Sequence, residues 1–381
     1  MMNFLRKSLT LEIENFVSHL KRDCGLSTFK SFTKSAFIQC RKKIQPEVFK
    51  RLNNLLIDEF YTDNELGIKR WNSFRVLAVD GSSVNLPFTK ELQQIYGLTK
   101  NQTDTGIVQA RVSVLYDVLN NYVLDGILSP KVIGERSLAL RHLVKSKIND
   151  FIIYDRGYPS YDFIHEHYKR NLAFLIRTKV SFSAVTKDFV ANGKTTQVVE
   201  IYPGKKTIII DKEYHKNTPI KVRLIRIDLP SGDTELLITS LLDNKKYPHK
   251  IFKELYFKRW KVETFYDELR NKLKVEHFSG YSHQSILQNF NASLFISNIQ
   301  TLVVSDLEKD IKKIAKTREL DYKVNNNLSY GFLKNRMISL FFNNPNMEDV
   351  LSELKILFKK ELIPIRPNRS NERNIGKYRR K

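Results

Sequence analysis

Two aspartates stand where short apolar runs end. Asp80 follows residues 75–79 and Asp155 follows residues 151–154, and each run has the length and composition of a buried β-strand. A glycine lies within two residues after each aspartate and allows a tight backbone turn. A carboxylate at a strand end is held rigidly and stays open to a ligand, and Mg²⁺ binds one or two carboxylates together with waters and substrate phosphates. Taken singly, an aspartate in this position is more often a turn former, so the pair alone does not decide its chemistry.

A third acid lies in a predicted helix of about residues 248–274. Four polar residues of this helix fall near one face, at offsets of 0, +3, +7 and +14: Tyr256, Arg259, Glu263 and Arg270. An adjacent apolar stripe lets the helix pack on a core. Arginine grips phosphate oxygens with two parallel hydrogen bonds, so this face could position a DNA strand beside a metal. Without the two aspartates, an ordinary i, i+4 salt bridge between Arg259 and Glu263 would explain the same spacing.

The charge balance points to a polyanionic partner. The 381 residues include 64 Lys and Arg against 41 Asp and Glu, a formal net charge of +23. Such an excess repels itself unless a polyanion binds, and nucleic acid is the leading candidate because each neutralised phosphate releases counterions. A merely soluble basic protein is the alternative.

Three kinds of protein are excluded or disfavoured by the sequence. No apolar run is long enough to span a membrane, so no membrane association is expected. The first ten residues lack the features of a secretory signal, so we expect a cytoplasmic, nucleoid-associated protein. With only Cys24 and Cys40 present, neither a disulfide framework nor a cysteine-based zinc site is expected.

The elements around the three acids predict a mixed α/β fold. Residues 1–70 read as a helical N-terminal region, with helices near 11–20, 32–38 and 48–60 and many basic residues that bind DNA or form a solvated face. Strands are predicted at 75–79, 110–116, 122–128, 151–154 and 173–177, with a helix at 137–147 and another that Ser160 begins. This order predicts a ribonuclease H-like mixed sheet flanked by helices, within a core of residues 71–280.

The rest of the chain completes a four-part division. A β-rich insertion is predicted at about 179–243, with strands at 198–202, 207–210, 222–227 and 236–239 and a turn at 230–233. Residues 281–365 read as a helical C-terminal region, with helices at 287–314 and 347–360, which we expect to dimerise. Residues 366–381 form a basic tail, for which contact with phosphates and an ordinary solvated tail are the two interpretations.

The three acids lie in motifs that resemble those of the DDE transposases of bacterial insertion sequences. The motifs are L-A-V-D-G-S at 77–82, D-R-G-Y at 155–158 and Y-x-x-R-x-x-x-E at 256–263, and the acids are separated by 75 and 108 residues. The order and spacing resemble the group defined by a Y-R-E-K signature (the insertion-sequence-four family, cut-and-paste type), whose β insertion precedes the glutamate-bearing helix. Arg270 stands where that signature has a lysine. Some members stack a flipped base on a tryptophan of the insertion, but the tryptophans here are Trp71 and Trp260, so Phe182, Phe189 or Tyr202 would have to stack instead.

The resemblance implies a metal-dependent DNA transposase with nuclease and strand-transfer activity. Asp80, Asp155 and Glu263 would be the catalytic and metal-binding residues, holding two Mg²⁺ ions for which Mn²⁺ substitutes. The DNA-contacting residues would be Tyr256, Arg259, Arg270, Arg156 and Tyr158. The implied partners are double-stranded DNA (the terminal inverted repeats and the target) and a second copy of the chain on paired ends.

Two other functions stay open at this stage. One is a different ribonuclease H-like nuclease that cleaves without joining, and the other is a non-catalytic DNA-binding protein derived from a transposase. Asp104, Asp117 and Asp125 are rival acids in the first half of the core.

Overall fold

The computed structural model describes residues 8–63, 67–99, 106–204, 218–229, 232–342 and 347–366. The chain divides into two compact units: residues 1–13 with 32–298, and residues 14–31 with 299–381. The first unit contains all three acids singled out above. The division into four sequence segments stays a prediction.

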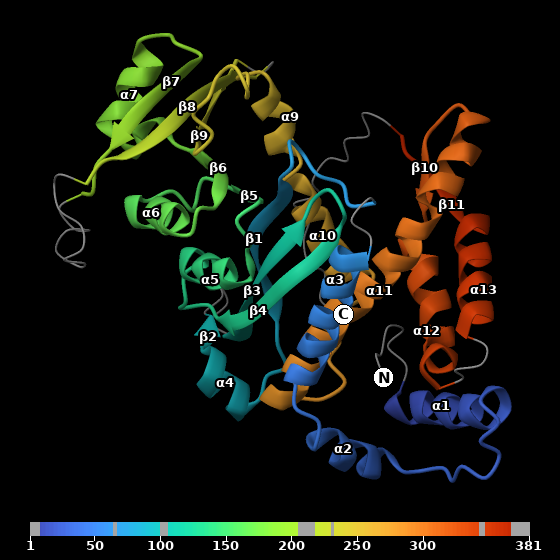
Figure 1. Cartoon of the computed structure of the whole chain (residues 1–381). Helices are drawn as coiled ribbons and strands as arrows, with labels where there is room; N and C mark the ends of the chain where they lie inside the picture. The colour runs from blue at the N-terminus through green and yellow to red at the C-terminus, as the bar shows by residue number, and fades with distance from the viewer. Residues whose placement is uncertain are drawn as a thin grey trace. The chain divides into compact units, whose positions relative to one another are not determined.

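A nine-stranded mixed sheet forms the centre of the first unit (Figure 1). Its main path runs β2-β3-β1-β5-β6-β9-β8-β7, and β4 pairs with β3. β1 is antiparallel to β3 and parallel to β5, and β5 is parallel to β6. The core strands β4-β3-β1-β5-β6 have the order of the expected ribonuclease H-like sheet. The strands are β1 (Arg75–Asn85), β2 (Leu98–Thr99), β3 (Ile107–Asp117), β4 (Tyr122–Pro130), β5 (Asp150–Tyr154), β6 (Ala173–Thr178), β7 (Thr196–Ile201), β8 (Ile220–Asp228) and β9 (Thr234–Thr239).

β1 is longer than its apolar run, which corrects one expectation. It pairs with β5 only over residues 75–78 but continues against β3 to Asn85. Asp80 therefore lies within β1 rather than at its end, two residues beyond the last pair with β5. The apolar run is the part of β1 that lies between β3 and β5. The polar continuation of β1 pairs with β3 alone, so fewer of its side chains need to be apolar. The carboxylate still stands where β1 loses one neighbour, so its side chain remains accessible.

Helices cover both faces of the core strands. The side chain of Ser82 receives a hydrogen bond from α10, whereas a Cβ on Gly81 would meet Glu135 of α5 at 2.8 Å. Because neighbouring residues of a strand point to opposite faces, α5 and α10 lie on opposite sides of the sheet. Figure 1 shows α5 and α6 together on one side. The helices of this unit are α2 (Lys34–Lys42), α3 (Glu47–Asp63), α4 (Lys90–Tyr96), α5 (Glu135–His142), α6 (Tyr161–Lys169), α7 (Ala184–Ala191), α9 (Ile251–Phe257) and α10 (Trp260–Asn271).

Local sequence signals fix several helix starts. Ser160 accepts a hydrogen bond from the backbone N–H of Phe163 and caps α6, as expected. Thr33 and Thr89 cap α2 and α4 in the same way. Ser183 and Thr186 form a capping box at α7, a helix that lies inside the segment expected to be β-rich.

The insertion extends the core sheet. β6 pairs antiparallel with β9, β9 with β8, and β8 with β7, while α7 contacts β7 and β8. Three of the four expected insertion strands are present as β7, β8 and β9. The fourth, at 207–210, lies outside the described residues, as do two residues of the expected turn, Pro230 and Ser231.

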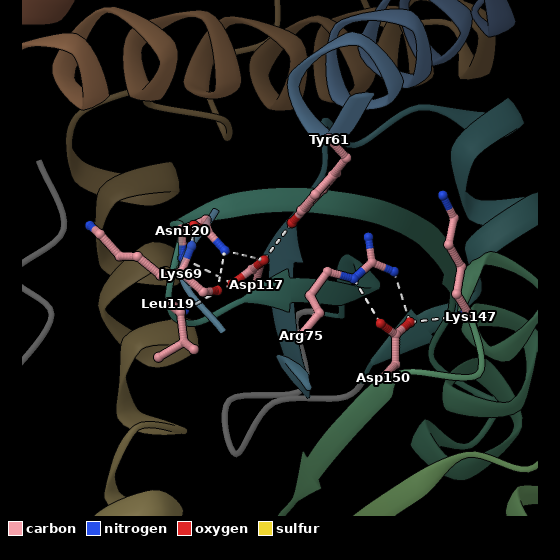
Figure 2. A network of polar contacts seen from close by, with 8 residues as sticks. All are labelled: Tyr61, Lys69, Arg75, Asp117, Leu119, Asn120, Lys147 and Asp150. Atoms are coloured by element: carbon pink, nitrogen blue, oxygen red, sulfur yellow. Dashed lines mark hydrogen bonds and ion pairs between the residues drawn. The ribbon is translucent and has the colours of Figure 1, made fainter. Parts of the chain in front are cut away.

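A buried polar network joins α3 to the beginning of the core sheet (Figure 2). Asp117 accepts hydrogen bonds from the Tyr61 hydroxyl and from the backbone and side chain of Asn120. Arg75 donates twice to Asp150, at 2.7 and 2.8 Å, and its guanidinium lies 4.7 Å from the centre of the Tyr61 ring. Breaking such a pair would leave a buried charge uncompensated, which is strongly destabilising. Through Tyr61, the helix α3 is therefore attached to the sheet.

The second unit is mainly helical. It contains α12 (Asn326–Phe342), α13 (Met347–Lys360) and a short pair of strands, β10 (Tyr322–Val324) and β11 (Leu362–Pro364). α11 (His283–Lys316) and α1 (Leu9–Asp23) contribute residues to both units. The sequence did not predict α12 or the strand pair. No helix among the described residues is both long and apolar enough to cross a membrane.

Candidate active site

The backbone of Asp80, in β1, is fixed by a hydrogen bond from α10. The Tyr266 hydroxyl donates to the carbonyl oxygen of Asp80 at 2.6 Å, which fixes α10 against β1 at this residue. The Asp80 side chain is only 20% exposed. Burial raises the pKa of its carboxyl group to about 6, although the nearby charge of Arg259 acts in the opposite direction.

Asp155 follows β5 directly and is held from two sides. The Tyr256 hydroxyl donates to its Oδ1 at 2.9 Å, and Nη1 of Arg177 lies 3.9 Å from the same oxygen. Burial alone would raise the pKa of this carboxyl group. The backbone N–H of Arg156, the charge of Arg259 and the Tyr256 hydroxyl together lower it below its ordinary value.

The helix expected at 248–274 is two helices, α9 and α10, which meet at residues 258–259. The backbone N–H groups of Lys258 and Arg259 bond three residues back, to Leu255 and Tyr256, which is the tighter 3₁₀ pattern. This tightening places Arg259 at the N-terminus of α10 and Glu263 in its first turn. The expectation of one continuous helix was wrong, because apolar periodicity does not reveal a single tightened turn.

Arg259 lies among the three carboxylates. Its Nη2 donates to Oε1 of Glu263 at 2.7 Å, and its Nη1 lies 3.8 Å from Oδ2 of Asp80. Its charge also helps to lower the pKa of Asp155. The charges of Glu263 and Asp155 both raise the pKa of Asp80, so all three acids are neighbours. The salt bridge between Arg259 and Glu263 thus exists, but it is part of a four-residue cluster.

The donor set of this cluster fits a divalent cation. The carboxylate oxygens of Asp80, Asp155 and Glu263 are ligands of the kind that Mg²⁺ prefers. In the present side-chain arrangement, no three acid, histidine or cysteine side chains of the described residues converge closely enough to ligate one ion together. The guanidinium of Arg259 lies between two of the carboxylates instead.

The other expected DNA-contacting residues differ in exposure. Arg156 is exposed, whereas Tyr158 is 1% exposed and packs against Tyr154 and Phe163. Arg270 is exposed and donates to the carbonyl oxygen of Ser83 at 2.7 Å. Contact of these three side chains with DNA stays a prediction.

Two residues beside the site were missed by sequence reasoning. Arg177 lies at the end of β6, where it bridges Asp155 and Glu235, whose Oε1 is 2.8 Å from its Nη2. Glu135 lies at the start of α5 with its side chain over Gly81. Arg177 ends an apolar run beside the Asp155 strand, and this position was a signal that could have revealed it. Nothing in the sequence singles out Glu135.

The rival acids have structural partners. Asp117 belongs to the Tyr61 network described above. Asp125 accepts from His142 at 2.8 Å and pairs with Lys50 at 2.9 Å, and His142 in turn lies 3.0 Å from the Ser113 hydroxyl. Asp104 lies outside the described residues.

The aromatic residues considered for base stacking are not equivalent. Phe189 is 1% exposed, so it belongs to the core beneath α7 and cannot stack on a base, which corrects that suggestion. Tyr202 is exposed, and Phe182 is partly exposed.

Comparison with known proteins gives the family. Residues 71–299, more than half of the chain, match the family model of the transposase DDE domain. The chain belongs to this family. Asp80, Asp155, Arg259 and Glu263 all lie inside the matched segment.

Curated proteins and solved structures give two further comparisons for this member of the transposase family. No curated protein matched it. A cryo-EM structure of the piggyBac transposase synaptic complex with hairpin DNA is similar, with 10% sequence identity and a TM-score of 0.41. The similarity covers 84% of this chain and 60% of that chain, so this chain spans about three fifths of that protein's length. Transposases of the DDE family use divalent metal ions, in agreement with the donor set.

Proposed function

We propose that this chain is a DNA transposase of the Y-R-E-K group of bacterial insertion-sequence transposases. It cleaves the ends of an insertion sequence and joins them to target DNA. The observation that carries the proposal is the meeting of Asp80, Asp155 and Glu263 around Arg259 in a member of the transposase DDE family. The Y-R-E-K assignment rests on Tyr256, Arg259 and Glu263, with Arg270 in place of the lysine.

Asp80, Asp155 and Glu263 would hold two divalent cations, Mg²⁺ or Mn²⁺. When bound, such ions activate an attacking oxygen and stabilise a leaving one. Tyr256 would keep the Asp155 carboxylate in its orientation through the hydroxyl bond. Arg259, Arg270 and the exposed Arg156 would contact DNA phosphates, since guanidinium groups match their geometry.

The proposed cleavage and joining are two successive displacements at phosphorus. In the first, a water oxygen bonds to the scissile phosphorus, the bond to the 3′ oxygen breaks, and that oxygen takes a proton to become a 3′-hydroxyl. In the second, this hydroxyl bonds to a target phosphorus, loses its proton, and displaces a target 3′ oxygen. The residues at the site orient the phosphate for both steps, which lowers the barrier by positioning.

The test is a cleavage and joining assay on a duplex that carries the element's inverted repeat. Asp80→Asn, Asp155→Asn and Glu263→Gln should each reduce cleavage by about 10³-fold or more while DNA binding is retained. Asp267→Asn, an exposed acid of the same helix, is the matched control and should cleave normally. Chelation of the metal with EDTA should stop the wild type, and excess Mg²⁺ should restore it.

Two results would contradict the proposal. Cleavage by Asp80→Asn in Mg²⁺ at the wild-type rate would remove the catalytic assignment. Cleavage by the wild type without any joining product would indicate a ribonuclease H-like nuclease rather than a transposase.

A further inference from the structure

Arg259 is unusually placed for a residue that contacts DNA. Its side chain is 4% exposed, and its two terminal nitrogens face Glu263 and Asp80 rather than solvent. Its guanidinium also lies 5.7 Å from the ring centres of Tyr256 and Trp260. A group in this position cannot reach a DNA phosphate without first leaving the carboxylates.

The charges show why Arg259 stays there. Three acids gather at one site, and Arg259 is the positive group in contact with two of them. Opposite charges this close attract each other, and the attraction is stronger where the side chains are shielded from water. Yet Nε of Arg259 is buried and has no hydrogen-bond partner among the described residues. The guanidinium is therefore held by one hydrogen bond to Glu263 and by its charge, and a divalent cation, with twice the charge, could take its place between the carboxylates.

We propose that Arg259 is an internal counter-ion that Asp80 and Glu263 exchange for a divalent cation, and that the released guanidinium then binds the DNA phosphate. This inference rests on the proposed function, because it requires a metal-dependent site that acts on DNA. It adds a regulatory property: the cation and the DNA phosphate favour each other's binding. The metal site would then fill with cations only when DNA is bound. Without DNA, Arg259 would occupy the position of the cation.

The first test measures Ca²⁺ binding by calorimetry in the absence of DNA, with Ca²⁺ as a probe for the cation site. Arg259→Gln should bind Ca²⁺ about tenfold or more tightly than the wild type, because the competing charge is gone. Arg259→Lys keeps the charge and should stay within about threefold of the wild type. Lys258→Gln, the partly exposed neighbour whose ammonium pairs with Glu254, is the matched control and should not change Ca²⁺ affinity.

A second readout follows Arg259 itself. In a Trp71→Phe background, Trp260 is the remaining tryptophan, and the guanidinium lies against its ring. Ca²⁺ should change the Trp260 emission of this protein but not that of the same protein carrying Arg259→Gln. A merely structural role of Arg259 would not produce this metal-dependent signal.

The coupling with DNA gives the third readout. Because coupling between two ligands is reciprocal, Ca²⁺ should raise the affinity for a duplex end, and the duplex should raise the affinity for Ca²⁺ by the same factor. Arg259→Gln should lose this coupling. Asp80→Asn, which tests the proposed function, should lose Ca²⁺ binding.

The outcomes separate the two proposals. If Asp80→Asn loses Ca²⁺ binding while Arg259→Gln binds Ca²⁺ no more tightly than the wild type, the counter-ion inference is overturned and the metal site stands. If Asp80→Asn binds Ca²⁺ normally, the proposed function itself fails.

Discussion

At the scale of single residues, the site depends on hydroxyl and guanidinium groups that orient carboxylates. Tyr256 is 3% exposed, and its hydroxyl donates to Asp155. A hydrogen bond to a charged acceptor contributes about 1.5–3 kcal/mol. In this structure the Tyr256 hydroxyl therefore holds the Asp155 carboxylate, a contact that the sequence motif did not reveal.

Tyr256→Phe should keep the packing of the ring and lose only this bond. We expect the single-turnover cleavage rate to fall about tenfold, because Asp155 loses one of the groups that orient it, with DNA affinity unchanged. Tyr281→Phe removes a hydroxyl from an exposed ring and should have no effect. An unchanged rate in Tyr256→Phe would show that Asp155 is oriented without it.

A buried histidine makes stability depend on pH. His167 of α6 is 0% exposed, lies 2.8 Å from the Tyr154 hydroxyl through Nε2, and contacts the Phe163 carbonyl through Nδ1. Burial lowers its pKa to about 4, from about 6.5 in an unfolded chain. The unfolded state therefore binds more protons between these pH values, and stability falls as the pH drops from 6.5 towards 4.

Protonation of His167 should lower the unfolding free energy by up to about 3 kcal/mol between pH 6.5 and pH 4. Urea unfolding at several pH values should show a steeper loss in the wild type than in His167→Gln, which cannot titrate. Parallel pH profiles for the two proteins would rule out His167 as the cause.

At the scale of elements, the sequence predicted the strands that consist of apolar runs, but not the extension of a strand or the break in a helix. Residues 75–79 and 151–154 revealed β1 and β5, because strands buried on both faces need continuous apolar side chains. The extension of β1 past Asp80 was not visible, since it depends on pairing with β3. The break between α9 and α10 was also hidden, as neither glycine nor proline marks it. Glu135 reaches the site only through the packing of α5 on the sheet.

The packing of α11 on β4 gives a prediction at this scale. A Cβ on Gly126 of β4 would collide with the Leu294 side chain and lie 3.3 Å from Phe290, and both of these residues are on α11. Gly126→Ala should therefore reduce the unfolding free energy by about 1–3 kcal/mol, and adding Leu294→Ala should recover part of this loss.

Gly331→Ala is the matched control for this substitution. Its Cβ would meet no atom within 4 Å, and the residue lies in the helix α12, so stability should rise by up to about 1 kcal/mol. Denaturant unfolding measures all three variants. Equal stability of Gly126→Ala and the wild type would mean that α11 can shift away from β4.

At the scale of the whole molecule, the net charge of +23 and the proposed reaction together predict which partners the chain assembles with. Cutting two ends and inserting both requires two active sites, so we predict a homodimer on paired DNA ends, with residues 281–365 as the proposed dimer region. Light scattering of the protein mixed with end DNA should give two chains for two duplexes. A complex with a single chain on one end would contradict synapsis.

DNA binding should weaken steeply with salt, because phosphate contacts release counterions. Removal of the basic tail, 366–381, should lower the slope of log affinity against log salt by several units if its seven Lys and Arg residues contact phosphates. An unchanged slope would identify the tail as a solvated end.

The most direct measurement of the central claim is the number of Mn²⁺ ions bound by the protein on a duplex end, counted by electron paramagnetic resonance. The wild type and Asp267→Asn should each bind two ions. Asp80→Asn, Asp155→Asn and Glu263→Gln should each bind fewer, because every one of these carboxylates is proposed to hold metal. Two bound ions in all five proteins would contradict the account.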